Sequence, residues 1–171
     1  YMLLCWYFEK KLPFQATTVK RFNEEFTAWS KSNASKYSKI FIVDLDTSKC
    51  DMDVVDKSNV VIIDHHESHK AIYKKAAHFI QSSTSCTKLI YKTMTASITD
   101  IQKYLVLLAD DYDSYKLQLE HTYDLNTIFW TYQGNRVEKF YNEFKDGFNG
   151  FNNFHKNIIL IHNRKLVELK E

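Results

Sequence analysis

Glycine, proline and cysteine are all scarce in this chain of 171 residues, and each shortage excludes a class of site. The three glycines fall after residue 130, so the first three quarters of the chain contain no glycine-rich loop of the kind that cradles phosphates. The single proline, Pro13, follows an apolar stretch over residues 1–12, where it predicts the end of a helix.

The three cysteines, Cys5, Cys50 and Cys86, are an odd number at wide spacings and form no Cys-x-x-Cys pair. This pattern favours reduced thiols in a cytoplasmic protein, and it argues against a structural zinc site. Long hydrophobic runs are missing too, because the apolar start YMLLCWYF meets the charged residues EKK well before the roughly 20 residues that span a membrane. We therefore expect no membrane partner, no membrane-spanning helix and no signal peptide.

Neither sign of charge is in excess, since 23 basic and 21 acidic residues leave a formal net charge of +2. This balance provides no strong electrostatic footprint for nucleic acid, although local contact with a phosphate backbone is compatible with it. Hydrophobic residues make up 44% of the chain, which predicts a folded core rather than disorder.

Two continuous apolar runs, IFIVDLD at 40–46 and VVIID at 60–64, are typical of buried parallel strands. A third strand is predicted at 78–82. Helices are predicted from a cap at Thr17 or Thr18, from a cap at Thr84 or Ser85, and over the ranges 98–109, 136–146 and 152–170.

This alternation of strands and helices predicts an α/β fold, with a Rossmann-like parallel sheet, helices on both faces and a helical C-terminal segment. The composition changes near residue 117, where Asn, Phe, Gly and Tyr become frequent. We therefore predict an α/β domain over residues 1–116 and a helical extension or linker over residues 117–171.

Both predicted strands end at an aspartate, Asp44 in the first and Asp64 in the second, and two histidines, His65 and His66, follow Asp64 directly. In an open parallel sheet, ligands bind beyond the carboxyl ends of the strands. If the two strands are neighbours, these side chains converge on one edge of the sheet.

Carboxylates together with imidazoles suit Mn²⁺, Mg²⁺, Zn²⁺ or Fe²⁺. Several carboxylates at one edge repel one another, and a divalent cation removes that cost. Two cations sharing Asp44 could hold a hydroxide between them for attack on phosphorus. Taken alone, an aspartate at a strand end usually caps a turn, but the joint pattern is much less expected by chance.

The motif Asp64-His65-His66 after an apolar strand, with Asp44 at the end of an earlier strand, resembles the DHH phosphoesterase superfamily. A later aspartate of that family matches within LLADDYDSY. Asp111 is favoured there because Tyr115, four residues on, fits the family's register, while Asp110 and Asp113 remain alternatives. The resemblance covers roughly residues 39–116.

The resemblance implies a phosphoesterase with two metal ions, usually Mn²⁺, with Mg²⁺ as the alternative. Carried over by position, Asp44 would bridge the ions, and His65 and Asp111 would complete the shell of one of them. Asp64 and His66 would be the catalytic pair. Asp64 would orient an imidazole, and His66 would face the phosphate and stabilise its charge in the transition state.

Two family features have no counterpart in this chain. The first family motif, His or Asn with Asp-x-Asp-Gly on a strand, does not occur before Asp44, and YMLLCWYF is similar to the helix that follows that motif. The glycine-rich substrate domain that often follows is not found either. We therefore expect a chain that lacks the first strand, with low activity because its metal shell is incomplete.

The resulting hypothesis is a metal-dependent phosphodiesterase or phosphatase that uses a metal-bound hydroxide on a nucleotide or short single-stranded oligonucleotide. The alternative is a non-catalytic module that binds a nucleotide or a protein. Aromatic residues of NTIFWTYQGN could stack bases, and Lys88, Lys92 and Arg136 could hold phosphate, but core packing and plain surface charge are the simpler interpretations. The histidines outside the motif are interpreted as surface or structural residues: His69, His78, His121, His155 and His162.

Overall fold

The computed structural model describes residues 1–94 and 97–169, which form two compact units. The first, called the sheet unit here, comprises Leu12–Thr95. The second, the helical unit, combines Tyr1–Lys11 with Ala96–Glu171, so the two parts of its chain flank the sheet unit in sequence. The division after residue 116 that the sequence predicts remains a prediction.

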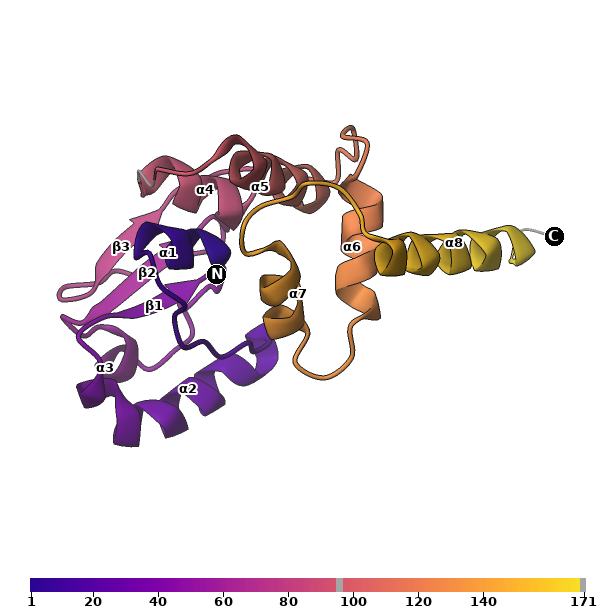
Figure 1. Ribbon diagram of the computed structural model, residues 1–171. Helices are drawn as coiled ribbons and strands as arrows, with labels where there is room; N and C mark the ends of the chain where they lie inside the picture. Colours follow the sequence, from indigo (N-terminus) through magenta and orange to yellow (C-terminus); the bar gives the residue numbers. More distant parts are fainter. Residues whose placement is uncertain (95–96, 170–171) are drawn as a thin grey trace. The chain divides into compact units, whose positions relative to one another are not determined.

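The sheet unit is built on three parallel strands in the order β1-β2-β3, which span Ile40–Val43, Val60–Asp64 and Ala77–Ile80 (Figure 1). All five residues of β2 are buried, as its central place in the sheet requires. The structure therefore confirms the α/β class and the three predicted strands. β1 ends at Val43, so Asp44 is the first residue beyond it.

Helices cover both faces of this sheet, as the sequence predicts. α2 (Val19–Asn33) and α3 (Met52–Val55) lie on one side, and α4 (Cys86–Thr93) lies on the other (Figure 1). Phe22 of α2 belongs to a core cluster with Ile42 and Ile62 of the sheet. Because side chains alternate along a strand, the neighbours of Ile62 in β2 point to the opposite face.

The N-termini of α2 and α4 agree with the predicted caps. Thr18 is the N-cap of α2, and Ser85 is the N-cap of α4, where its hydroxyl accepts a hydrogen bond from the Lys88 backbone N–H. The polar stretch 30–38 continues α2 to Asn33 and adds the 3₁₀ helix η1 (Ala34–Lys36). Its polar side chains favour this ending because Asn33 donates to the Trp29 carbonyl of the preceding turn.

The helical unit contains five α-helices among its described residues: α1 (Met2–Tyr7), α5 (Asp100–Asp113), α6 (Thr122–Thr131), α7 (Arg136–Phe144) and α8 (Asn153–Glu168). Their apolar residues form a second core, which includes Leu108 of α5, Ile128 of α6 and Phe144 of α7. The last residue of the predicted helix 152–170 lies outside the described residues. The helical C-terminal segment is confirmed.

Two elements of the helical unit differ from the sequence expectation. α5 runs four residues past the predicted end, so the acidic cluster lies in its last turn and not beyond it. α6 has no predicted counterpart. Threonines weaken its helical signal, and the hydroxyls of Thr127 and Thr131 bond back to carbonyls one turn earlier.

None of the helices in the described part of the chain is long and apolar enough to cross a membrane. The three cysteines are free thiols, with Cys5 and Cys86 buried and Cys50 partly buried.

Candidate metal centre

The carboxyl edge of the sheet gathers the side chains that follow β1 and β2. The Asp44 N–H donates to the Ile63 carbonyl at 3.0 Å, which extends the pairing of the two strands by one residue. Asp44 then adopts φ 60°, in the left-handed region that non-glycine residues rarely occupy. Backbone strain of this kind is concentrated at functional sites.

Asp44, His65 and His66 each offer one ligand atom, and these three atoms lie within 4.8 Å of one another. Among the described residues they are the only such group of three or more. Two ligand atoms on the same ion, each about 2.1 Å from it, are about 3 Å apart. The distance from His65 Nε2 to Asp44 Oδ1 is 3.2 Å, so this pair has the spacing that one cation requires.

The tautomer of His65 strengthens this interpretation. Its Nδ1 lies 3.1 Å from the Ser83 carbonyl, which can only accept a hydrogen bond, so Nδ1 carries a proton. In a neutral imidazole Nε2 then presents a lone pair to the Asp44 carboxylate. Two acceptors at this distance repel each other unless a proton or a metal ion lies between them. A backbone carbonyl behind a histidine is also the usual support of a metal ligand.

Asp64 lies behind the imidazoles, with its side chain fully buried. Its Oδ1 accepts from His66 Nδ1 at 2.6 Å and from the His65 backbone N–H at 3.0 Å. Its Oδ2 accepts from His69 Nδ1, also at 2.6 Å. Because both oxygens are engaged, Asp64 holds the imidazoles of His66 and His69 in place by hydrogen bonds.

His66 is half-exposed at the open side of this group, with 44% of its side chain accessible. Its hydrogen bond to Asp64 raises its pKa, and the negative charges of Asp64, Asp44 and Asp46 act in the same direction. The imidazolium form of His66 therefore persists to a higher pH than that of an unperturbed histidine. A positively charged donor at an open edge is suited to contact an anion.

Asp111 belongs to the helical unit, where its carboxylate holds the loop between α5 and α6. Its Oδ2 accepts from the Thr122 hydroxyl at 2.6 Å and from the Leu119 N–H at 2.9 Å, and its Oδ1 accepts from the Gln118 N–H at 3.2 Å. The hydrogen bond from Thr122 is the main reason that the pKa of Asp111 is lowered. A role for Asp111 as a metal ligand remains a prediction.

The alternatives to Asp111 lie in the same last turn of α5. Asp110 is buried and Asp113 is exposed. Tyr115, which set the register for Asp111, is largely exposed in a left-handed conformation. Within the helical unit, Asp111 is thus the aspartate whose carboxylate is fixed by the start of the next helix.

The sequence interpretation missed His69 as part of the site. It was grouped with surface or structural histidines, but its side chain is fully buried and contacts Asp64 directly. The available signal was its position in HHESH, three residues after His66 in the same loop. His155, in the helical unit, is also buried, and burial lowers its pKa.

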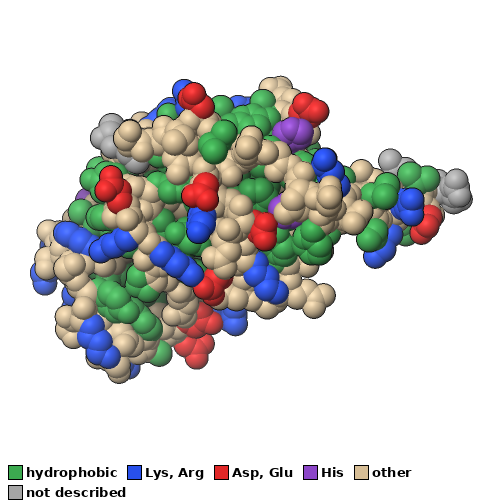
Figure 2. All heavy atoms as spheres, in the orientation of Figure 1, with side chains coloured by type: hydrophobic (Ala, Val, Ile, Leu, Met, Phe, Trp, Pro, Cys, Tyr) green, Lys and Arg blue, Asp and Glu red, His purple; other side chains and the backbone are tan. Residues whose placement is uncertain are grey.

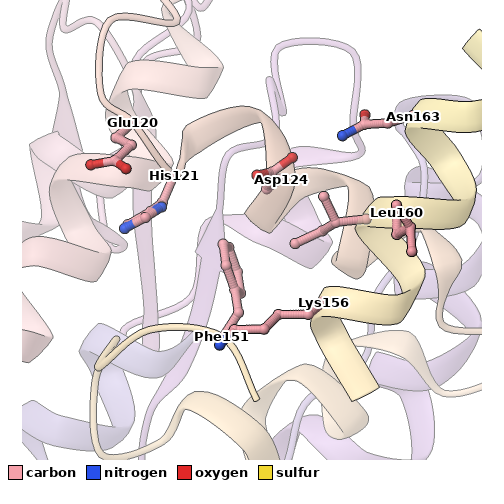
Figure 3. A pocket seen from close by; sticks show the side chains of 8 residues that line it. Glu120, His121, Asp124, Phe151, Lys156, Leu160 and Asn163 are labelled. Carbon is pink, nitrogen blue, oxygen red and sulfur yellow. The ribbon is translucent and has the colours of Figure 1, made fainter. Parts of the chain in front are cut away.

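A hollow of about 390 Å³ lies on the surface of the helical unit (Figure 3). Its lining combines acidic, imidazole, amine and apolar groups: Glu120, His121, Asp124, Phe151, Lys156, Ile159, Leu160 and Asn163. The hollow is wide open, and its acidic and imidazole groups do not form a metal-ligand group of the kind seen at Asp44 in the described chain. It therefore offers weaker chemistry than the edge of the sheet.

Trp130 and Arg136, two residues considered for contact with nucleic acid, contact each other. Trp130 is exposed, but the Arg136 guanidinium lies 4.3 Å from the centre of its ring. Arg136 also donates from Nε to the Tyr132 carbonyl at 3.1 Å. These contacts are typical of a local cation–π pair that covers one aromatic side chain.

Functional evidence from related proteins is lacking for this site. Comparisons with models of known protein families, with curated proteins and with solved structures found no match to this chain.

Proposed function

We propose that this protein is a metal-dependent phosphoesterase whose cation is held by Asp44 and His65. The observation that carries the proposal is the close group of Asp44, His65 and His66 at the carboxyl edge of a parallel sheet. A carboxylate and a neutral imidazole are ligands that Mn²⁺ accepts, and Mg²⁺ is the alternative. Asp111 is retained as a proposed further ligand.

A bound divalent cation would lower the pKa of a coordinated water and offset the negative charge of a phosphate group. The protein supplies the rest of the chemistry. Asp44 is exposed over 54% of its side chain, and His66 over 44%, so both are open to a ligand from solvent. Asp64 fixes the His66 ring, and protonated His66 donates a hydrogen bond to a phosphate oxygen as its charge grows.

The proposed substrate is a phosphate ester, with nucleotides and short single-stranded oligonucleotides as the class that the family resemblance implies. On the face shown in Figure 2, basic and acidic side chains are interspersed, in line with the small net charge. Such a surface favours a small substrate bound through the site over a long polyanion held by a basic groove.

A non-catalytic binding module is the second candidate, and one observation favours it. Both oxygens of Asp111 already accept hydrogen bonds inside the helical unit. A carboxylate used in this way has less capacity left for a metal ion. The two candidates differ in turnover, because a binding module would take up metal or nucleotide without hydrolysing a phosphate ester.

The first test is calorimetric titration of Mn²⁺ and Mg²⁺ into the wild-type protein and into His65→Ala. We expect at least one ion to bind and the substitution to weaken binding by 10-fold or more, on the order expected for loss of a metal ligand. His162→Ala is the matched control, because His162 lies in the helical unit and contacts Tyr123. Equal binding by wild type and His65→Ala would remove His65 from the ligand set.

The second test measures hydrolysis of bis-4-nitrophenyl phosphate with Mn²⁺. The phosphoesterase proposal requires metal-dependent turnover that His66→Gln reduces without a matching loss of metal affinity. Tight metal binding with no turnover would instead support the binding module.

A further inference from the structure

A buried chain of hydrogen bonds extends inward from the candidate metal centre and is not needed to hold the cation. His69 Nδ1 contacts Asp64 Oδ2 at 2.6 Å, and His69 Nε2 contacts the Tyr73 hydroxyl at 2.6 Å. The Thr47 hydroxyl contacts both the Tyr73 hydroxyl and, at 3.3 Å, His69 Nε2. Thr47 is fully buried and Tyr73 is 7% exposed.

We infer that His69 is a positioning residue which, supported by Tyr73 and Thr47, fixes the Asp64 carboxylate and through it the orientation of the His66 ring. The inference rests on the proposed function, because it gives the open His66 ring a defined task. The chain joins the loop after β1, the end of β2 and the loop between β2 and β3. Its members therefore come from the segments that form the site.

The direction of each hydrogen bond follows from the groups involved. The Asp64 carboxylate can only accept, so His69 Nδ1 donates to it, as His66 Nδ1 does on the other oxygen. His69 Nε2 is then free to accept from the Tyr73 hydroxyl, and the Tyr73 oxygen accepts from Thr47. Burial raises the pKa of Tyr73, so the phenol keeps the proton that it donates.

Every donor in this chain points toward Asp64, and bonds aligned in this way strengthen one another among buried side chains. The two oxygens of Asp64 are thus divided between two histidines, one buried and one at the open edge. If His69 is removed, Oδ2 loses its partner in a buried place, and the carboxylate can rotate toward other donors. The ring of His66 then loses its fixed support.

The test uses His69→Leu, which removes the bond, and His69→Asn, whose amide N–H can replace Nδ1–H. Tyr73→Phe is the second variant, because it deletes only the hydroxyl and keeps the buried ring. The first readout is the imidazole ¹H–¹⁵N NMR spectrum of the metal-free protein. In wild type we expect His66 to be protonated at Nδ1 and to give a downfield proton signal. We expect this signal to be lost in His69→Leu and to return in His69→Asn.

The second readout is turnover with Mn²⁺. We expect His69→Leu to lower kcat by about 10- to 100-fold with a small change in KM, and His69→Asn to recover most of that loss. Tyr73→Phe should lower kcat in the same direction by a smaller factor. His162→Asn is the control, because His162 lies in the helical unit and its ring contacts the Tyr123 hydroxyl.

The alternative is that the chain only ties the loops together. In that case the His69→Leu protein would have a lower melting temperature, while its folded fraction would keep the wild-type His66 spectrum and the wild-type kcat. That result would overturn the inference. The NMR readout needs neither metal nor turnover, so it distinguishes failure of the positioning role from failure of the proposed function.

Discussion

The strongest single-residue feature is the left-handed backbone of Asp44. An L-residue in this conformation costs roughly 1–2 kcal/mol relative to ordinary backbone, and glycine avoids most of that cost. The same residue places its carboxylate 3.2 Å from His65 Nε2. Asp44 therefore combines conformational strain with the position of a proposed metal ligand, and strain of this kind clusters at functional sites.

We predict that Asp44→Gly raises the free energy of unfolding of the metal-free protein by about 1 kcal/mol and weakens Mn²⁺ binding strongly. Urea denaturation and calorimetric titration measure the two effects. Asp44→Asn is the control, because asparagine tolerates the left-handed conformation but lacks the charge. A metal-free Asp44→Gly protein that is less stable than wild type would contradict the assignment of strain.

The second prediction concerns His66 and pH. Its pKa is raised by the Asp64 hydrogen bond, so the folded state binds its proton more tightly than the unfolded state. The stabilisation is fully present below the unfolded pKa, near 6.5, and it is lost as the pH rises through the folded pKa. The stability gap between wild type and His66→Gln should therefore be larger at pH 6 than at pH 9.

Thermal unfolding of both proteins without metal across this pH range measures that gap. His162→Gln serves as the reference for a histidine in the helical unit, where its ring contacts the Tyr123 hydroxyl and Asp124 is the nearby acidic residue. A gap that widens as the pH rises would show that the Asp64 bond does not stabilise the imidazolium.

Among elements, the connection between α7 and α8 depends on one glycine. Gly147 has φ +110°, and a Cβ at this position would lie 2.6 Å from backbone atoms of Ile101 and Gln102 at the start of α5. The next residue, Phe148, donates its N–H to the Ile101 carbonyl at 2.9 Å. The close approach of two backbones therefore leaves no room for any other residue.

We predict that Gly147→Ala destabilises the helical unit by more than about 2 kcal/mol, because it adds a backbone clash to an unfavourable φ. Gly134→Ala is a matched control. It has φ +70° but no atom within 4 Å of the added Cβ, so it should cost only about 1 kcal/mol. Urea denaturation followed by circular dichroism compares them, and equal losses would exclude the clash as the cause.

Sequence patterns predicted some of the secondary-structure elements and missed others. Continuous apolar runs identified β1 and β2, which pair in parallel, because strands covered on both faces of a sheet are apolar throughout. α6 escaped detection because threonine has low helix propensity, and only packing of Leu125 and Ile128 into a core reveals why the helix is stable. Tertiary contacts, and not local propensity, therefore make α6 helical.

The candidate site was partly predictable for a similar reason. Asp44, His65 and His66 each follow a recognisable strand, so their approach could be expected from topology. The contacts of His69 were harder to predict, because it lies in an irregular loop and one of its partners, Thr47, comes from the separate loop after β1. No local periodicity encodes such a hydrogen-bonded chain.

At the scale of the whole molecule, segments that are adjacent in sequence can belong to different structural units. α1 belongs to the helical unit, where the Trp6 indole N–H donates to the Lys145 carbonyl at 2.6 Å and Met2 packs against the core. This hydrogen bond joins residues 139 positions apart, so the sequence of residues 1–12 could not predict it. That sequence predicted only a helix that ends near Pro13.

The split chain of the helical unit sets the order in which the protein can be completed during translation. α1 leaves the ribosome before the sheet unit, yet Met2 and Trp6 pack against a core formed by α5–α8, which are synthesised later. All strands and helices of the sheet unit are synthesised before α5–α8, so the sheet unit can fold as a nascent domain. Until those helices emerge, Met2 and Trp6 lack these partners, so a chaperone could recognise this apolar segment.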